Sequence, residues 1–446
     1  MKILCHVGPW SKGFFESVCE GIESDSDVLI SSAHKSVDDS GISHRYYDFL
    51  TKNRHNLYTA NEKDEDIIAR CRLLRDIPKN QAMLHLNSMR EAIAEMFEFY
   101  KPDLVLSETI DAYIMDLFYE ECKQRNIKFI GLVTCFVNGY FRVSARGEYH
   151  NLREPDDSEV ERVLNMIEEK SYAPSFVASS KNKPYKSVLK RWVRNLIKPP
   201  YFFIKRFLSG EKYNYHYWAT QIISSQWFHI LPRLNLGQAD WENQLEVTDK
   251  PIIYVPLQMV PEATVDYWCE SLDYIDYDTT LLKFIDNFST DFHFLIKEHP
   301  NVLGFRHPGL YKKLQARNNV TICPTNTRSN EIIDKFDSTL VWTGTVGFES
   351  ALRGKPVITF CRPFYASGSM FFEIGLNTKA EDIIDFIDKQ SSQLADIEKS
   401  NMIKYLLSGL LPGAVKFDGT WSAKSDSDVL MATSLGRNLA IYVQIR

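Results

Sequence analysis

The sequence predicts an α/β protein made of two Rossmann-like halves with a helical insertion between them. Short apolar runs alternate with helical patterns over residues 1–150, the alternation stops over residues 151–240, and it resumes at Pro251. Residues 339–360 run from an apolar segment through a glycine-containing turn and a helical pattern to a second apolar segment, which is the order of a βαβ unit. Ligands of such parallel sheets bind beyond the carboxyl ends of the strands.

In the first half, apolar residues recur at helical spacing from Met83 to Tyr100, until Pro102 ends the pattern. A second helix is predicted at residues 110–124. The predicted strands of this half are residues 2–7, 27–32, 104–106 and 128–134.

The second half follows the same alternation. Its predicted strands are residues 252–256, 292–297, 320–323, 339–342 and 357–360. Its predicted helices are residues 281–288, 329–335 and 380–390. Residues 396–446 read as a partly helical tail, which we expect to pack back on the first half.

Length and composition exclude several classes of protein. A chain of 446 residues predicts two or three domains. The net charge of −6 argues against general nucleic-acid binding. No apolar run has the length of a membrane span and no signal peptide is recognisable, which favours a cytoplasmic protein. The 8 cysteines are scattered without Cys-x-x-Cys spacing, so we expect reduced thiols and no zinc site.

Residues 181–212 combine many lysines and arginines with aromatic residues, and prolines 199 and 200 divide the segment. One interpretation is an interfacial element that contacts the anionic inner membrane or receives a lipid-linked acceptor. The other is a basic helical insertion whose aromatic side chains pack on its own domain. The sequence leaves both open.

The turn within residues 339–360 is a candidate phosphate site. Backbone N–H groups at the start of a helix favour anions, and Gly344, Thr345, Val346 and Gly347 form this start. Glu349 follows in the first turn, where its carboxylate can accept a hydrogen bond from a sugar hydroxyl. The alternative is a tight turn that only packs the helix on the sheet.

His299 and Pro300 follow the strand predicted at residues 292–297. The proline restricts the backbone of His299, which holds the imidazole in place. An imidazole at this position can donate to a phosphate oxygen and stabilise the charge that grows on a departing nucleotide. Both the histidine and the glycine turn follow strands of the same predicted sheet, so we expect them to converge.

These motifs together resemble a known family. Glu298-His299-Pro300, the run from Gly344 to Leu352, Gly354-Lys355-Pro356-Val357 and Pro363-Phe364-Tyr365 are similar, in order and spacing, to the capsule-polysaccharide biosynthesis glycosyltransferases. That family includes transferases that use CMP-Kdo, a CMP-activated eight-carbon acidic sugar. The resemblance covers roughly residues 250–370 and does not extend to the N-terminal half or the insertion.

The resemblance implies a GT-B fold, in which two Rossmann-like domains face a central cleft, and a nucleotide-sugar donor without a metal or other cofactor. It places the donor on His299, Pro300, Gly344, Thr345 and Glu349, with Gln258 as a further contact. From the alternation along the chain we expect an N-terminal acceptor domain at 1–150, the insertion and linker at 151–245, a nucleotide-sugar domain at 246–395 and the tail at 396–446.

The first half is expected to supply the acceptor side. Glu108 follows the strand at 104–106, where a carboxylate can act as general base on an acceptor hydroxyl; alternatively, it caps the next helix. Asp111 is the second candidate carboxylate. Weaker candidates for holding an acceptor or another anion are Ser11, Lys12 and Arg142, with Arg146 as a further one.

Other patterns receive a structural interpretation. Asp276-Tyr277-Asp278 matches the Asp-x-Asp metal motif of another glycosyltransferase fold, but no predicted strand leads into it, so we expect a solvated acidic loop. His293 lies within a strand pattern and is expected in the core, whereas His6 is ambiguous.

The predicted function is glycosyl transfer in bacterial surface-polysaccharide assembly, from CMP-Kdo to a glycan or lipid-linked acceptor. A UDP-sugar donor is the near alternative. The diphosphate of such a donor normally needs a further cationic contact, which Arg328, Arg353 or Lys355 can provide. A polyol-phosphate transferase, a nucleotide-sugar epimerase and a non-catalytic scaffold are the remaining alternatives.

Overall fold

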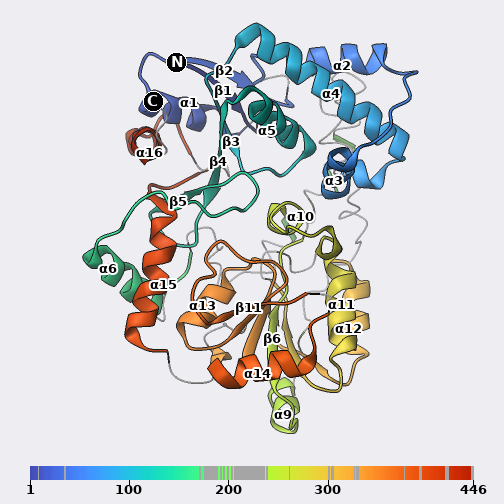
Figure 1. Ribbon diagram of the computed structural model, residues 1–446, viewed down its shortest axis with the longest axis vertical. Helices are drawn as coiled ribbons and strands as arrows, with labels where there is room; N and C mark the ends of the chain where they lie inside the picture. Colours follow the sequence, from blue (N-terminus) through green and yellow to red (C-terminus); the bar gives the residue numbers. More distant parts are fainter. Residues whose placement is uncertain are drawn as a thin grey trace. The chain divides into compact units, whose positions relative to one another are not determined.

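The computed structural model describes residues 1–8, 10–34, 37–169, 172–174, 240–260, 262–299, 306–325, 331–375, 377–390, 394–416 and 421–442, with separate positions between 189 and 237 and at 302 and 327. The chain divides into two compact units. Unit 1 includes Met1–Arg153 and Ser408–Arg446, and unit 2 includes Ser225–Leu407 and the segment that begins at Glu154 (Figure 1). Most of the segment predicted at 181–212 lies outside the described residues, and so does Pro300.

Unit 1 contains a six-stranded sheet of order β12-β5-β4-β3-β1-β2. Its strands are β1 (Lys2–His6), β2 (Asp27–Ser31), β3 (Leu104–Glu108), β4 (Lys128–Thr134), β5 (Tyr140–Val143) and β12 (Leu410–Pro412). The first four are parallel, as expected of a Rossmann-like half. The sequence did not predict the antiparallel edge, where β5 pairs with β4 and β12 pairs with β5.

The two faces of this sheet are covered by different helices because alternate strand residues point to opposite sides. Leu4 of β1 packs with residues of α2 (Ile42–Lys52), α3 (Glu62–Arg70), α4 (Lys79–Tyr100) and α5 (Tyr113–Arg125). Ile3 and Cys5 pack on the other side with α1 (Lys12–Ile22) and α16 (Asp426–Tyr442). A 3₁₀ turn, η1 (Leu74–Asp76), joins α3 to α4.

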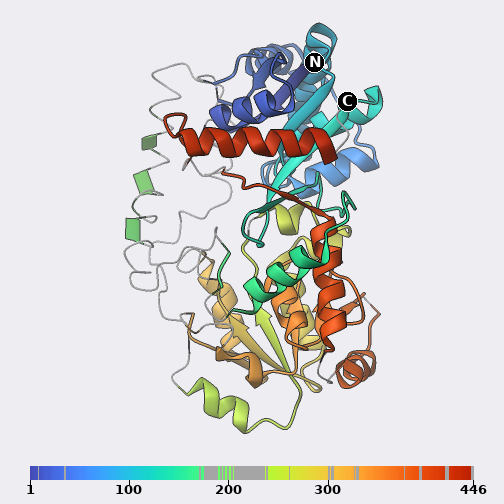
Figure 2. The same cartoon turned by 90° about the vertical axis from the view of Figure 1, so that its left-hand side faces the viewer.

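Helix α16 brings the end of the chain onto its beginning, and Figure 2 shows it alongside α1. A Cβ atom at Gly21 of α1 would lie 2.0 Å from the carbonyl oxygen of Thr433, and one at Gly436 would lie 2.0 Å from that of Val18. Only glycine at both positions permits this close approach of the two helices.

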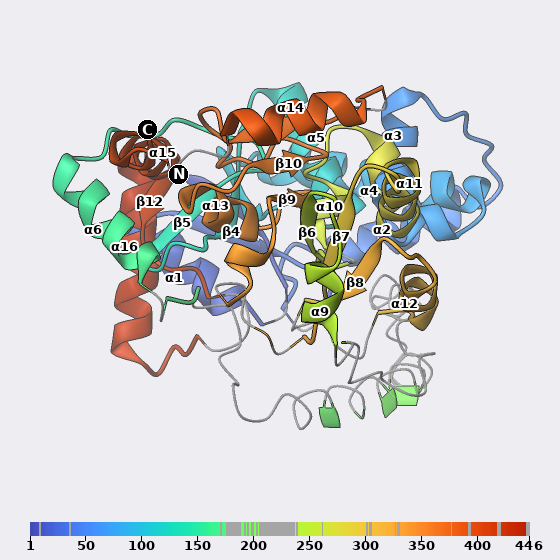
Figure 3. The ribbon, with the colours of Figure 1, turned by 90° about the horizontal axis from the view of Figure 1, so that it is seen from below.

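Unit 2 contains a six-stranded parallel sheet of order β11-β10-β9-β6-β7-β8, and Figure 3 labels β10, β9, β6, β7 and β8 in this order. Its strands are β6 (Ile252–Pro256), β7 (His293–Lys297), β8 (Val320–Ile322), β9 (Ser338–Val341), β10 (Val357–Thr359) and β11 (Phe371–Glu373). The α/β fold class with two Rossmann-like sheets is thereby confirmed.

The helices of unit 2 also divide between the two faces. Those packed on Ile253 and Phe294 are α10 (Ala263–Asp266), α11 (Tyr277–Asn287), α12 (Pro308–Gln315) and α14 (Ala380–Gln390). Tyr254 and Leu295 face α9 (Trp241–Glu246) and the start of α13 (Val346–Leu352). The remaining elements are the 3₁₀ turns η3 (Leu272–Tyr274) and η5 (Ile333–Lys335) and the helices α6 (Asp157–Glu168) and α15 (Asp396–Ser408).

Three predictions from the sequence need correction: a helix, a loop and the state of the cysteines. The helix predicted at 329–335 is only η5 within the described residues. The acidic loop at Asp276 is the start of α11, because Asp276 caps it by accepting a hydrogen bond from the N–H of Thr279 at 3.3 Å. The thiols are not all reduced, because Cys269 and Cys361 form a disulfide. The six other cysteines are free and buried.

Candidate functional site

The carboxyl edge of the sheet in unit 2 gathers the residues that the sequence singled out. Gln258 follows β6, His299 follows β7 and Gly344 follows β9. Strand β6 pairs with both β7 and β9, so it lies between them. Because neighbouring strands are about 4.8 Å apart, the loops that carry His299 and Gly344 start about 10 Å from each other. The three loops leave one edge of one sheet.

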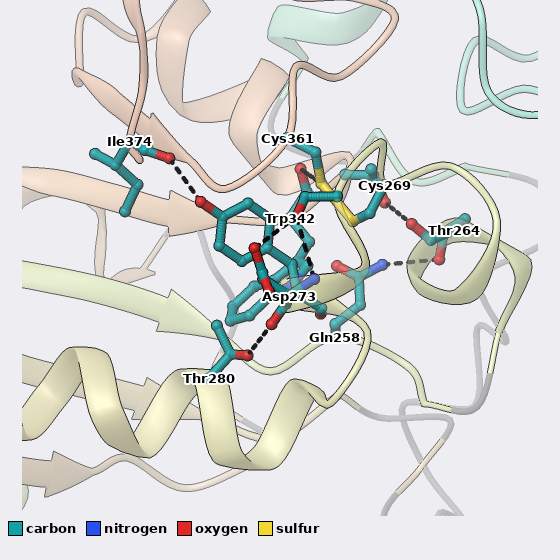
Figure 4. Close-up of a disulfide and its surroundings, with 11 residues drawn as sticks. Gln258, Thr264, Cys269, Asp273, Thr280, Trp342, Cys361 and Ile374 are labelled. Carbon is teal, nitrogen blue, oxygen red and sulfur yellow. Dashed lines mark hydrogen bonds between the residues drawn. A yellow bond between two sulfur atoms is a disulfide. The ribbon is translucent and has the colours of Figure 1, made fainter. Parts of the chain in front are cut away.

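Gln258 connects the middle loop to the glycine turn. A Cβ atom at Gly344 would lie 3.1 Å from Oε1 of Gln258, so the two residues are direct neighbours. The side-chain amide of Gln258 donates to Oγ1 of Thr264 at 3.2 Å, and Oγ1 of Thr343 donates to the Thr264 carbonyl at 3.0 Å. Figure 4 shows the Gln258 side chain pointing toward Thr264. Gln258 is 9% exposed and held in place.

The loop after β7 is anchored by a carboxylate, that of Glu298, for which the sequence predicted no separate role. Glu298 is 1% exposed and accepts hydrogen bonds from Nε of Arg306 at 2.7 Å and from Nη2 at 3.2 Å. The hydroxyl of Tyr311 also donates to Glu298, and the N–H of His299 donates to it at 2.5 Å. The acidic residue next to His299 is therefore an anchor for the histidine loop.

Arg306 links two loops of the edge. It donates to the carbonyl of Gln258 as well as to Glu298, and its guanidinium lies 5.6 Å from the ring centre of Tyr277. The Tyr277 hydroxyl accepts from the N–H of Gln258 at 2.9 Å. Burial opposes the charge of Arg306, but Glu298 outweighs it and raises the pKa of the guanidinium. Arg306 thus fixes the backbone of Gln258 relative to that of His299.

Arg306→Met is expected to destabilise unit 2, because it leaves the buried carboxylate of Glu298 without its ion-pair partner. Loss of one partner of a buried pair costs about 3–5 kcal/mol. The control is Arg317→Met, which breaks the exposed pair with Asp286 at 2.6 Å and is expected to cost about 0–1 kcal/mol. Denaturant unfolding measures both variants. Equal losses in the two would contradict the anchoring role of Arg306.

The glycine turn leaves a few backbone donors available. The N–H groups of Gly347 and Glu349 bond within the turn, to the carbonyls of Gly344 and Thr345 at 3.0 and 3.3 Å. Among the described residues, no acceptor faces the N–H groups of Thr345 and Val346. Thr345 is the N-cap residue of α13, and its side chain makes no capping bond. The available donors are fewer than the sequence predicted.

Gly347 and Tyr365 give this turn its shape. A Cβ atom at Gly347 would lie 2.7 Å from the Tyr365 hydroxyl and 3.0 Å from Val341, so this glycine permits close packing of α13 on the sheet. The Tyr365 hydroxyl donates to the carbonyl of Gly344. These contacts favour the packing interpretation for Gly347 and leave Gly344 and Thr345 at the edge.

Glu349 lies in the first turn of α13, partly buried, 3.9 Å from the guanidinium of Arg353. Burial raises the pKa of its carboxyl, and Arg353 and Lys297 counteract this shift. The position suits a carboxylate that accepts a hydrogen bond from a ligand hydroxyl.

The disulfide stabilises the same region. Cys269 and Cys361 have Cα atoms 5.4 Å apart and join the segment after α10 to the end of β10, next to Trp342 (Figure 4). Trp342 donates from its indole N–H to the carbonyl of Tyr274 at 3.1 Å. The cross-link closes a sequence separation of 92 residues, which composition and spacing did not predict.

In unit 1, the structure places Glu108 at the last position of β3, as expected. The alternative interpretation of Glu108 as a helix cap is wrong, because α5 begins at Tyr113 with Ala112 as its N-cap residue. Oγ of Ser11 lies 3.5 Å from Oε1 of Glu108. Burial, and then the charge of Asp111, raise the pKa of Glu108 to about 7. A carboxylate with this pKa can take a proton at neutral pH.

The other candidates of unit 1 have contacts of their own. Ser11 is fully buried and also donates to the Gly8 carbonyl at 3.2 Å. Lys12 pairs with Asp39 at 2.7 Å, and Asp111 pairs with Arg72. Arg142 is 2% exposed within β5 and donates to the carbonyl of Glu148 at 3.4 Å.

Arg146 and the two histidines have structural contacts. Arg146 pairs with Asp116 and Asp66, at 3.1 Å for the latter. His6 is 8% exposed, lies 3.1 Å from the Ser31 hydroxyl, and has its pKa lowered to about 4 by burial. His293 is buried against Thr321 at 2.9 Å, which confirms its predicted place in the core.

Within the described ranges, no cluster of three or more His, Cys, Asp or Glu side chains is placed to hold a metal ion. None of the helices that the structure describes combines the length and the apolar composition needed to cross a membrane.

Residues 208–381 match the model of a protein family described as capsule polysaccharide biosynthesis protein. This region includes β6 to β11 and with them Gln258, His299 and the turn at Gly344, so the predicted resemblance is confirmed over the part of the chain that forms the site. No curated protein matches the chain.

Solved structures with similarity to the chain include a Kdo transferase and a UDP-GlcNAc 2-epimerase. The β-Kdo 2,7-transferase of KpsC from Thermosulfurimonas dismutans is 18% identical, over 74% of this chain and 84% of that one, with a TM-score of 0.35. The UDP-GlcNAc 2-epimerase of Methanocaldococcus jannaschii is 13% identical, over 92% of this chain and 99% of that one, with a TM-score of 0.28.

Proposed function

We propose that this protein is a glycosyltransferase of bacterial surface-polysaccharide synthesis, which moves a sugar from a nucleotide donor to a glycan or lipid-linked acceptor. The observation that carries the proposal is the match of residues 208–381 to the capsule-synthesis family, because this region contains His299 and the Gly344 turn at one sheet edge. The donor that we propose is CMP-Kdo, and UDP-sugars are the alternative.

The donor site is assigned to the carboxyl edge of unit 2. His299 donates a hydrogen bond to a phosphate oxygen of the donor, and the amides of Thr345 and Val346 donate to the same phosphate. Glu349 accepts from a ribose hydroxyl. One imidazole and two amides suit the single phosphate of a cytidine monophosphate leaving group, since charge-assisted donors stabilise the anion as it departs.

Glu108 is the proposed general base. The acceptor hydroxyl gives its proton to Glu108, its oxygen forms a bond to the anomeric carbon, and the bond from that carbon to the phosphate oxygen breaks. The electron pair leaves with the nucleotide, whose negative charge His299 stabilises. A pKa of about 7 keeps a sizeable fraction of Glu108 ionised at neutral pH while it remains a good proton acceptor.

A thermal-shift comparison of CMP, CDP, UDP and GDP tests the donor class. A ligand that binds only the folded protein stabilises it by about 2.7 kcal/mol at 100 times its Kd, so the nucleotide of the donor is expected to raise the Tm most. We expect the cytidine nucleotides to give the largest shift. A larger shift with UDP would favour the UDP-sugar alternative, and no shift with any of the four would contradict a nucleotide-sugar enzyme.

A further inference from the structure

Lys297 is the last residue of β7, two positions before His299, and its side chain is 8% exposed. Because strand residues alternate, it shares a face of the sheet with Leu295 and Tyr254. The start of α13 packs on this same face through Val346. The side chain of Lys297 therefore shares its face of the sheet with the start of α13, and the charges of Glu349 and Glu298 act on it.

The charge of Lys297 is compensated only in part, by carboxylates that make no direct contact with its ammonium. Among the described residues, no acceptor lies within hydrogen-bond or ion-pair distance of its ammonium. The charged or titratable groups that influence it are the carboxylates of Glu349, Glu298 and Glu331 and the thiol of Cys323. Despite the carboxylates, burial lowers the pKa of Lys297, just as it raises that of Glu349. A buried cation without a direct partner is costly unless a ligand supplies the anion.

Three other cations that the structure describes in unit 2 are already engaged, and Lys355 precedes β10 at the opposite edge of the sheet. Lys355 donates to the carbonyl of Phe336 at 2.7 Å, Arg353 lies against Glu349, and Arg306 is paired with Glu298. Arg353 and Lys355, which the sequence predicted as contacts of a second phosphate, are thus less suited than Lys297 to bind one. Arg328 lies outside the described residues.

We propose that Lys297 is a specificity-determining residue of the donor site, which binds a second anionic group of the donor beyond the phosphate assigned to His299. This inference rests on the proposed function. The second anion is either the carboxylate of an acidic sugar or the second phosphate of a nucleoside diphosphate, because both present a negatively charged oxygen to the ammonium. In both cases the donor class is a nucleotide with two anionic groups.

The test compares Lys297→Met with Lys312→Met, a control on the exposed surface of α12. Titration calorimetry measures the affinities for CMP, for CDP, for a CMP-linked acidic sugar and for inorganic pyrophosphate. A charged hydrogen bond is worth roughly tenfold or more in affinity, so wild type is expected to bind at least one two-anion ligand that much more tightly than CMP. Lys297→Met is expected to lose this preference and keep the affinity for CMP.

Unfolding of the ligand-free variants separates binding from folding. Because Lys297→Met removes a buried charge that has no direct partner among the described residues, its Tm is expected to equal or exceed that of wild type, whereas a structural ion pair would make the variant less stable. Preference for CDP identifies a second phosphate, and preference for the acidic sugar identifies a carboxylate. A two-anion preference that survives in Lys297→Met overturns the inference and leaves the proposed function standing.

The pyrophosphate arm keeps the inference independent of the nucleotide. If wild type binds no nucleotide but binds pyrophosphate in a way that requires Lys297, the anion site stands and the proposed function falls. If wild type binds none of the four ligands, or binds CMP as tightly as both CDP and the CMP-linked acidic sugar, the inference is overturned.

Discussion

His299→Ala is expected to lower kcat by a factor of about 10²–10³, the loss that follows removal of one preorganised donor to a developing negative charge. His299 follows β7 at the sheet edge where Gln258 and Gly344 lie, and Glu298 fixes the backbone of His299 by accepting its N–H. In the proposed reaction it donates to the phosphate as the glycosidic bond breaks. Initial rates with a nucleotide-sugar donor measure the effect.

The matched control is His307→Ala, since His307 is an exposed histidine of the same unit that caps α12 by accepting from the N–H of Gly309 at 3.0 Å. Its loss is expected to cost about 1 kcal/mol of stability and to leave kcat unchanged. His299→Ala is expected to fold normally, because its backbone contacts to Glu298 and Val302 do not involve the imidazole. Wild-type rates in His299→Ala would remove the histidine from the mechanism.

Glu108→Gln is expected to lower kcat by a factor of about 10²–10⁴, the range for a positioned general base. The base must be ionised, and burial raises its pKa to about 7, so the wild-type rate is expected to rise with pH through about 7 and then level off. The variant has no carboxyl group at this position and is expected to lack this rise. A pH–rate profile of both proteins measures the difference.

Stability supplies a second readout for Glu108. Its folded-state pKa lies above the ordinary value of a glutamate, so the folded state binds the proton more tightly than the unfolded state. Stability from this group is therefore present at acid pH and is lost as the pH rises through about 7. Glu108→Gln is expected to remove this component of the pH dependence.

Asp111→Asn tests the environment of Glu108. The charge of Asp111 helps to raise the pKa of Glu108, so removal of this charge is expected to shift the rise in rate to lower pH.

Activity of Glu108→Gln within a few-fold of wild type would place the catalytic carboxylate elsewhere.

Strong local patterns let the sequence predict most strands and several helices. The apolar runs at β4 and β6 and the pattern of α14 predict the observed bounds, and the strand before Glu108 lies where β3 is found. These segments are short, apolar and bounded by polar residues, so local preference and burial agree.

The missed elements depend on weaker or more distant signals. Helix α2 begins after Gly41, which has a left-handed φ of 68° and makes no side-chain cap. Helix α3 does have a usable signal, because Asn61 and Asp64 form a capping box. Strand β12 has only three residues and pairs with β5, from which it is far removed along the chain, so no local pattern predicts it.

Topology could place the site, but not every residue in it. His299 and Gly344 were predictable because both follow strands of a parallel sheet, which end at the same edge. Arg306 was missed because its partners, Glu298 and the carbonyl of Gln258, lie on other loops. Lys297 was missed because it ends an apolar strand, and its isolation from acceptors exists only in the folded unit.

The proposed function requires that His299 and the Gly344 turn bind one phosphate of the donor. A crystal structure of the protein with bound CMP shows whether they do. We expect a phosphate within hydrogen-bond distance of the His299 imidazole and of the Thr345 and Val346 amides, beyond the carboxyl ends of β7 and β9. A phosphate held by other residues, with His299 directed away from it, would rule out this donor site.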